Sequence, residues 1–129
     1  MSLEMQGMSY SFENIRRVGK FTVFIEPYSI NNTVSYLPDV ILSHEIQKKL
    51  LKVVTAKLEK NYKISISSGS LYAGGNGMEF RLTAEEDKFQ VLIPNTQKAF
   101  SDWDYGYLLK YVDFLLDVES VLEKVEIEK

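Results

Sequence analysis

The sequence predicts an α+β fold, in which a single antiparallel sheet carries two long helices on one face. Three observations predict it: two segments with apolar residues at helical spacing, three segments in which apolar and polar residues alternate, and short connections between those three. Short connections make neighbouring strands antiparallel, and one-sided alternation gives the sheet one apolar face. Each helix has an apolar stripe to bury, so both are expected on that face. The expected order is (α)ββαβββα, a three-stranded meander plus an N-terminal strand or hairpin.

The chain is expected to begin with a flexible tail over residues 1–10, because this stretch is rich in Met, Ser, Gly and Gln. Residues 11–129 are expected to form a single α+β domain, since a chain of 129 residues suits one domain. Residues 11–18 are predicted to form a short helix, which Ser11 can cap and Gly19 can end.

The first half of the domain is expected to supply a hairpin and a helix. Residues 20–26 alternate and are rich in β-branched and aromatic side chains, which predicts a strand. Residues 33–37 are the expected return strand, because turn-forming residues precede them. The next helix is expected over residues 43–60, with Ser43 as its N-cap.

The meander is expected to contain three strands, over residues 62–67, 78–83 and 88–93. The glycine-rich stretch 73–77 is expected to be a hairpin tip, because Asn-Gly is a strong hairpin signal. The alternation predicts a core face made of Ile64, Ile66, Phe80, Leu82, Val91 and Ile93. It also predicts an at least partly exposed face made of Lys63, Ser65, Ser67, Glu79, Arg81 and Thr83.

The last helix, expected over residues 101–125, has an apolar arc about twice the ~100° that a surface helix needs. Its arc extends past the sheet-facing stripe through Tyr111, Phe114, Val118 and Val121. Either the N-terminal segment or a second subunit must cover this row. The N-terminal segment offers few apolar groups, so the sequence favours a homodimer, or a partner protein that covers the same surface. Glu119 falls within the apolar arc and is expected where the helix overhangs the sheet.

The start of the last helix carries the densest aromatic group of the chain. Trp103, Tyr105 and Tyr107 alternate with other residues, so they cannot all face inward within one helical turn. Exposed aromatic side chains of this kind anchor protein interfaces. With the over-wide apolar helix, they favour a small protein-binding adaptor or regulatory module that associates with itself or with another protein.

Two basic clusters support an alternative function, a nucleic-acid-associated accessory subunit. They consist of Arg16, Arg17 and Lys20, and of Lys48, Lys49 and Lys52. Nucleic acid is the minority interpretation, because the last helix begins with acidic residues and the exposed strand face lacks an aromatic platform.

A second alternative is a small-ligand binder or an enzyme that uses Gly74, Gly75 and Gly77, with His44 as acid or base. The glycine-rich stretch lies between two strands, whereas phosphate loops precede a helix, and no Gly-Lys-Ser/Thr follows it. Among the expected elements no catalytic constellation, cofactor site or metal site is recognisable. The sequence therefore favours a non-catalytic role.

The composition excludes thiol chemistry, because the chain has no cysteine. The chain carries a formal net charge of −3. Neither a signal peptide nor an apolar run of transmembrane length is recognisable, so we expect a cytoplasmic protein that does not contact a membrane.

Overall fold

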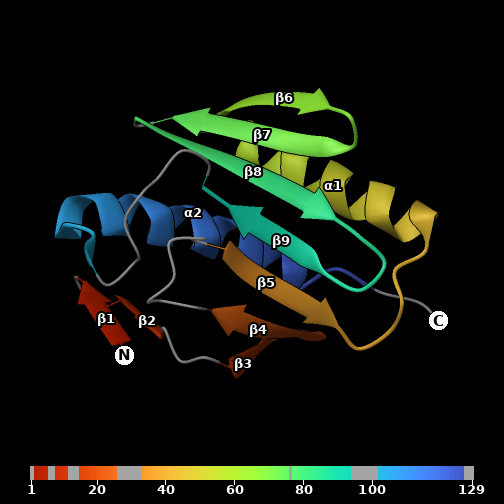
Figure 1. Cartoon of the computed structure of the whole chain (residues 1–129), viewed down its shortest axis with the longest axis horizontal. Helices are drawn as coiled ribbons and strands as arrows, with labels where there is room; N and C mark the ends of the chain where they lie inside the picture. The colour runs from red at the N-terminus through yellow and green to blue at the C-terminus, as the bar shows by residue number, and fades with distance from the viewer. Residues whose placement is uncertain are drawn as a thin grey trace.

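A computed structural model of the chain describes residues 2–5, 8–11, 15–25, 33–75, 77–93 and 102–126, with side chains from residue 17 onward. Figure 1 shows a broad twisted sheet in front of two helices. The main sheet has seven strands in the order β3-β4-β5-β9-β8-β7-β6, and every neighbouring pair is antiparallel. A separate two-stranded sheet pairs β1 with β2.

The main sheet consists of two meanders that meet at its centre. The N-terminal elements are β1 (Ser2–Met5), β2 (Met8–Ser11), β3 (Ile15–Val18), β4 (Phe21–Ile25) and β5 (Thr33–Pro38). The remaining elements are α1 (His44–Leu58), β6 (Lys63–Ser67), β7 (Ser70–Gly75), β8 (Met78–Ala84), β9 (Phe89–Leu92) and α2 (Tyr105–Leu122). Strands β5 and β9 pair and join the meanders. The predicted antiparallel sheet with two helices on one face is therefore confirmed (Figure 1).

The core lies between the sheet and the helix layer. Its centre is a stack of aromatic rings, in which the ring centroid of Phe80 on β8 lies 3.7 Å from that of Phe114 and 5.8 Å from that of Tyr111, both on α2. The ring of Tyr62, just before β6, meets Phe80 and Phe114 edge-on. This packing buries the wide apolar arc of α2 inside a single chain.

The predicted N-terminal helix is wrong where the structure describes it, because Ile15–Val18 is strand β3. These residues pair with β4 across a tight turn in which Gly19 has a φ of +57°. A helix over residues 11–18 would be too short to be stable on its own, whereas the β-branched Ile15 and Val18 gain from sheet pairing. Residues 12–14 lie outside the described part. The predicted division into a tail and one domain stays a prediction.

The predicted three-stranded meander is also wrong, since a fourth strand, β7, precedes the Asn-Gly pair. Ser68 and Gly69 both have positive φ, which marks a type I′ turn between β6 and β7. The predicted loop therefore begins as a strand, with Gly74 and Gly75 paired to β8. The hairpin expected near residue 77 does form, but it joins β7 to β8.

The predicted N-cap of α1 is confirmed, but that of α2 was not predicted. Ser43 accepts a hydrogen bond from the backbone N–H of Ile46 and precedes α1. Asp104 caps α2, so this helix starts later than predicted. Four of the six predicted core residues are buried, but Ile64 is half-buried and Ile66 is 67% exposed on the edge strand β6.

Glu119 of α2 is buried, and its predicted overhang is wrong. The hydroxyl of Tyr36 on β5 donates a 2.6 Å hydrogen bond to its carboxylate Oε2. Both side chains lie in the interior, where an unsatisfied polar group would destabilise the fold. The apolar arc of α2 thus contains a polar link to the sheet.

Candidate functional site

Six of the seven aromatic and apolar residues predicted as an interface are buried in the core or half-buried against it. Tyr111, Phe114 and Val118 are fully buried within one chain. The ring of Trp103 packs edge-on against Tyr107 and Tyr111, and Val121 is half-buried. Tyr105 remains 55% exposed. The homodimer stays a prediction, but the uncovered row that motivated it is already covered within the chain.

The two predicted basic clusters lie on different elements of the fold. Arg17 is on the open face, paired across β3 and β4 with Thr22. Lys48, Lys49 and Lys52 are exposed on α1, and Lys20 is exposed in the β3–β4 turn. The side chain of Arg16 lies outside the described residues. Among the described lysines and Arg17, the two clusters therefore lie on different elements.

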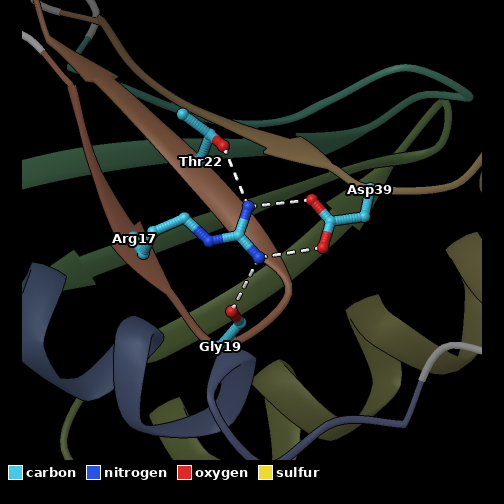
Figure 2. Close-up of polar contacts among 4 residues, drawn as sticks. All are labelled: Arg17, Gly19, Thr22 and Asp39. Carbon is cyan, nitrogen blue, oxygen red and sulfur yellow. Dashed lines mark hydrogen bonds and ion pairs between the residues drawn. The ribbon is translucent and has the colours of Figure 1, made fainter.

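Figure 2 shows that the side chain of Arg17 is hydrogen-bonded to neighbouring residues of the chain. Its Nη1 and Nη2 each donate a 2.8 Å hydrogen bond to the carboxylate of Asp39, and further bonds reach Thr22 Oγ1 and the backbone oxygen of Gly19. The hydrogen bond from Arg17 holds the pKa of Asp39 below its ordinary value, and the same bond raises the pKa of Arg17. This arginine already has a counter-ion.

The glycine-rich stretch supports packing at one position. A Cβ on Gly75 would lie 3.2 Å from the ring of Tyr62, so this glycine lets that ring approach the strand. Gly74 and Gly75 also border an open groove of about 530 Å³ beside Lys60 and Lys63. His44, at the exposed first turn of α1, lies on a different element. Within the described ranges, no three His, Asp or Glu side chains are placed to hold a metal ion.

A groove of about 440 Å³ runs between the two helices. Val53, Val121 and Val125 contribute apolar lining, and Lys49, Lys57 and Lys124 are among its polar lining residues. Nearby, burial raises the pKa of Asp117 on α2, and Lys57 opposes that shift. This groove is more polar than the one described next.

The last strand of the sheet, β6, has a partner on one side only within the described residues. Ser67 and Ser70 flank the two-residue turn and so form the hydrogen-bonded pair of this hairpin. Because hydrogen-bonded and non-hydrogen-bonded pairs alternate, Ile64 and Ile66 occupy the positions whose backbone N–H and C=O point away from β7. These backbone groups form an open pairing edge.

An apolar groove of about 480 Å³ lies beside this edge. It is lined by Lys48, Leu51, Lys52, Thr55, Ala56, Glu59, Ile66 and Gly69. Ile66 supplies its strand side, and Leu51 and Ala56 supply its helix side, while the two lysines form the rim. An exposed β-branched residue on an open edge is the feature that soluble proteins usually avoid. We define these residues together with β6 as the edge site.

Sequence reasoning missed the edge site because it treated Ile66 as core. The signal that could have found it is the dipeptide Ser68-Gly69, which fits a two-residue turn and so implies a strand on its other side. With that additional strand, the predicted strand order would have placed residues 62–67 at the edge of the sheet.

Comparisons of the chain with protein-family models, with curated proteins and with solved structures found no match. In the described part of the chain, neither helix is long and apolar enough to cross a membrane.

Proposed function

We propose that the protein is a non-catalytic binding module that accepts an extended segment of another protein alongside β6. The observation that supports this most directly is Ile66, which is 67% exposed on an edge strand next to an apolar groove. Strand addition to an exposed sheet edge is a common mode of peptide recognition. Backbone hydrogen bonds supply affinity in this mode, and pockets for alternate side chains supply specificity.

The incoming segment would form an eighth strand. Its backbone would hydrogen-bond to Ile64 and Ile66, whose outward N–H and C=O groups lack a strand partner in the described sheet. Every second side chain of the segment would then point toward the helix layer. There an apolar side chain would fit between Ile66 and Leu51, in the groove of the edge site.

The charges around the edge site favour an acidic segment. Lys48 and Lys52 lie at the groove, and Lys63 begins β6. Glu59 is the one acidic residue of the groove lining. A second copy of β6 would bring lysines of both chains together, which disfavours self-pairing at this edge. The preferred partner therefore alternates apolar and acidic residues in an extended conformation.

The proposal is tested by selecting binders from a displayed library of random peptides. Peptides enriched on the wild-type protein should lose binding to Ile66→Lys and retain it for Leu37→Lys, a matched control on the open face. Ile66→Pro should bind more weakly than Ile66→Ala, because both remove the side chain but only proline removes the outward N–H. Bound peptide should slow hydrogen exchange at the amides of Ile64 and Ile66.

Three results would contradict the proposal. These are equal binding to wild type and Ile66→Lys, loss of binding by the Leu37 variant, and enrichment without any acidic preference. The nucleic-acid alternative is separated by the double variant Lys48→Glu and Lys52→Glu with a fluorescent oligonucleotide. If the protein binds nucleic acid through these lysines, the double variant should lose oligonucleotide binding, and binding to the wild-type protein should fall steeply with salt. Oligonucleotide binding to Ile66→Ala should then equal that of the wild-type protein.

A further inference from the structure

Arg81 lies on the open face of the sheet, two strands away from β6 and on the opposite face from the groove of the edge site. It is on β8, paired with Tyr72 on β7 and with Leu92 on β9. All three side chains are half-buried. Sequence alternation predicted that Arg81 would be on the exposed face, but it did not identify Tyr72, because β7 was not recognised.

The guanidinium of Arg81 is held in place. Its carbon Cζ lies 5.9 Å from the ring centroid of Tyr72, within the range of a cation–π contact. Its Nη2 donates a long hydrogen bond, 3.4 Å, to Oγ of Ser70, which is itself buried. Both contacts come from β7, so the charge is fixed beside that strand.

The same guanidinium lacks a counter-ion among the described residues. No carboxylate oxygen there lies within salt-bridge distance, and its Nε is buried without a hydrogen-bond partner. A guanidinium stays charged in proteins, so it cannot escape the penalty of burial by losing its proton. Arg17 on the same face is the opposite case, because Asp39 neutralises it with two hydrogen bonds.

We propose that Arg81 is the anchor of a carboxylate-binding site on the open face. An incoming carboxylate would accept hydrogen bonds from the guanidinium fork and supply the missing negative charge. The hydroxyls of Ser70 and of Thr83, which are paired across β7 and β8, lie in the adjacent row of the same face. An apolar group attached to the carboxylate would contact Leu92 and the ring of Tyr72.

The charge balance favours a monoanion over a phosphate dianion. Arg81 contributes one positive charge, and Glu79 lies two residues away on the same face of β8. A second negative charge on the ligand would be repelled by that carboxylate without gaining another cation beside it. The ligand class is therefore a carboxylate next to an apolar group, carried by a free organic acid or by an acidic side chain of a partner protein.

The test uses the arginine side-chain Nε–H signals of the full chain labelled with ¹⁵N-arginine, in which three arginines give few signals. Phenylacetate is titrated at constant ionic strength, and neutral phenylacetamide serves as the matched control. The signal of Arg81 should shift and saturate with phenylacetate alone, while that of Arg17 should stay in place. A blocked Leu-Glu-Leu peptide and its Leu-Gln-Leu counterpart distinguish the two sources of the carboxylate.

The variants Arg81→Met and Arg81→Lys complete the test, with backbone amides of Tyr72 and Leu92 as reporters. Arg81→Met should abolish the response, and Arg81→Lys should weaken it several-fold, because lysine keeps the charge but loses the planar fork. Tighter binding of the Glu peptide than of phenylacetate would assign the site to a protein partner, and the reverse order to a free acid. Four results would each overturn the proposal. The signals of Arg17 and Arg81 could shift equally, or the shift could fail to saturate. The response could also survive in Arg81→Met, or inorganic phosphate could bind as tightly as the carboxylate.

Discussion

The two ends of the seven-stranded sheet differ in how completely the chain closes them. At one end, the turn between β3 and β4 packs against the end of α2, and a Cβ on Gly19 would lie 3.0 Å from backbone atoms there. Val18 is 2% exposed, and Arg17 is paired with Asp39. At the other end, Ile66 is 67% exposed and a groove separates β6 from α1.

This difference is the reason for proposing the β6 end, rather than the β3 end, as the binding site. At the β3–β4 turn, Gly19 packs against the end of α2, and Arg17 is hydrogen-bonded to Asp39, which directly follows β5. At β6, an apolar side chain and lysines border a groove beside an unpaired edge. Groups that are already paired add little affinity for a partner, whereas unpaired ones are free to contribute. The predictions below test this contrast, from the largest expected effect to the smallest.

The largest effect is expected for Gly19→Ala compared with Gly69→Ala. Both glycines have positive φ, at +57° and +78°, so alanine is strained at either position. Only at Gly19 would the new Cβ also meet helix backbone, which cannot move aside easily. We expect a loss of about 3 kcal/mol or more at Gly19 and about 1 kcal/mol at Gly69.

Urea unfolding of the two glycine variants measures this difference directly. Equal losses would show that the β3–β4 turn is not pressed against α2. The double variant should lose the sum of the two values, because the sites belong to opposite ends of the sheet and share no contacts.

The second contrast is between two β-branched residues on the two edge strands. Val18→Ala should lower the free energy of unfolding by about 2 kcal/mol, because it removes two buried methyl groups. Ile66→Ala should change it by at most about 0.5 kcal/mol, although it removes a larger group, since that group is mostly solvated. A large loss at Ile66 would mean that something in the chain covers the groove.

The layered architecture was predictable because it depends on periodicity, which a sequence records directly. Alternation identified the apolar face of β8 and β9, and helical spacing identified both helices. Strand β7 escaped because Ala73, Gly74 and Gly75 have little strand propensity of their own. Their pairing with β8 is a tertiary effect, in which the absence of side chains makes room for Tyr62 over Gly75.

The candidate sites were less predictable, because they depend on where each strand lies in the sheet and on which side chains it then contacts. Ile64 and Ile66 share one pattern, yet only the position of β6 at the sheet edge exposes the second one. Glu119 broke the apolar pattern of α2, but the pattern could not reveal that Tyr36 lies opposite it. Likewise, the lack of a counter-ion near Arg81 becomes visible only when its neighbours across the sheet are known.

A smaller effect is expected at the turn that closes the open end. Ser68 has a φ of +52°, a conformation that L-residues adopt at a cost and glycine adopts freely. Ser68→Gly should therefore stabilise the fold by about 0.5–1 kcal/mol, with part of the gain offset by the greater freedom of glycine in the unfolded chain. Thermal unfolding checks this, and a destabilised variant would contradict the type I′ turn.

The smallest effects concern two aspartates whose pKa values shift in opposite directions. The hydrogen bond from Arg17 lowers the pKa of Asp39 below 3.8, so its stabilising contribution is present above pH 3.8 and is lost as the pH falls through the lowered value. Burial raises the pKa of Asp117 above 3.8, so the folded state holds that proton more tightly and loses stability as the pH rises from 3.8 through the raised value.

In melting temperatures measured from pH 3 to pH 7, Asp39→Asn should be less stable than wild type at neutral pH, and the gap should close in acid. Asp117→Asn should be more stable than wild type at neutral pH, and its gap should also close in acid. Arg17→Gln is the matched control, because it removes the same pair and should reproduce the Asp39→Asn profile. If the Asp39 and Asp117 variants deviate from wild type in the same direction, the environments of the paired Asp39 and the half-buried Asp117 do not differ as described.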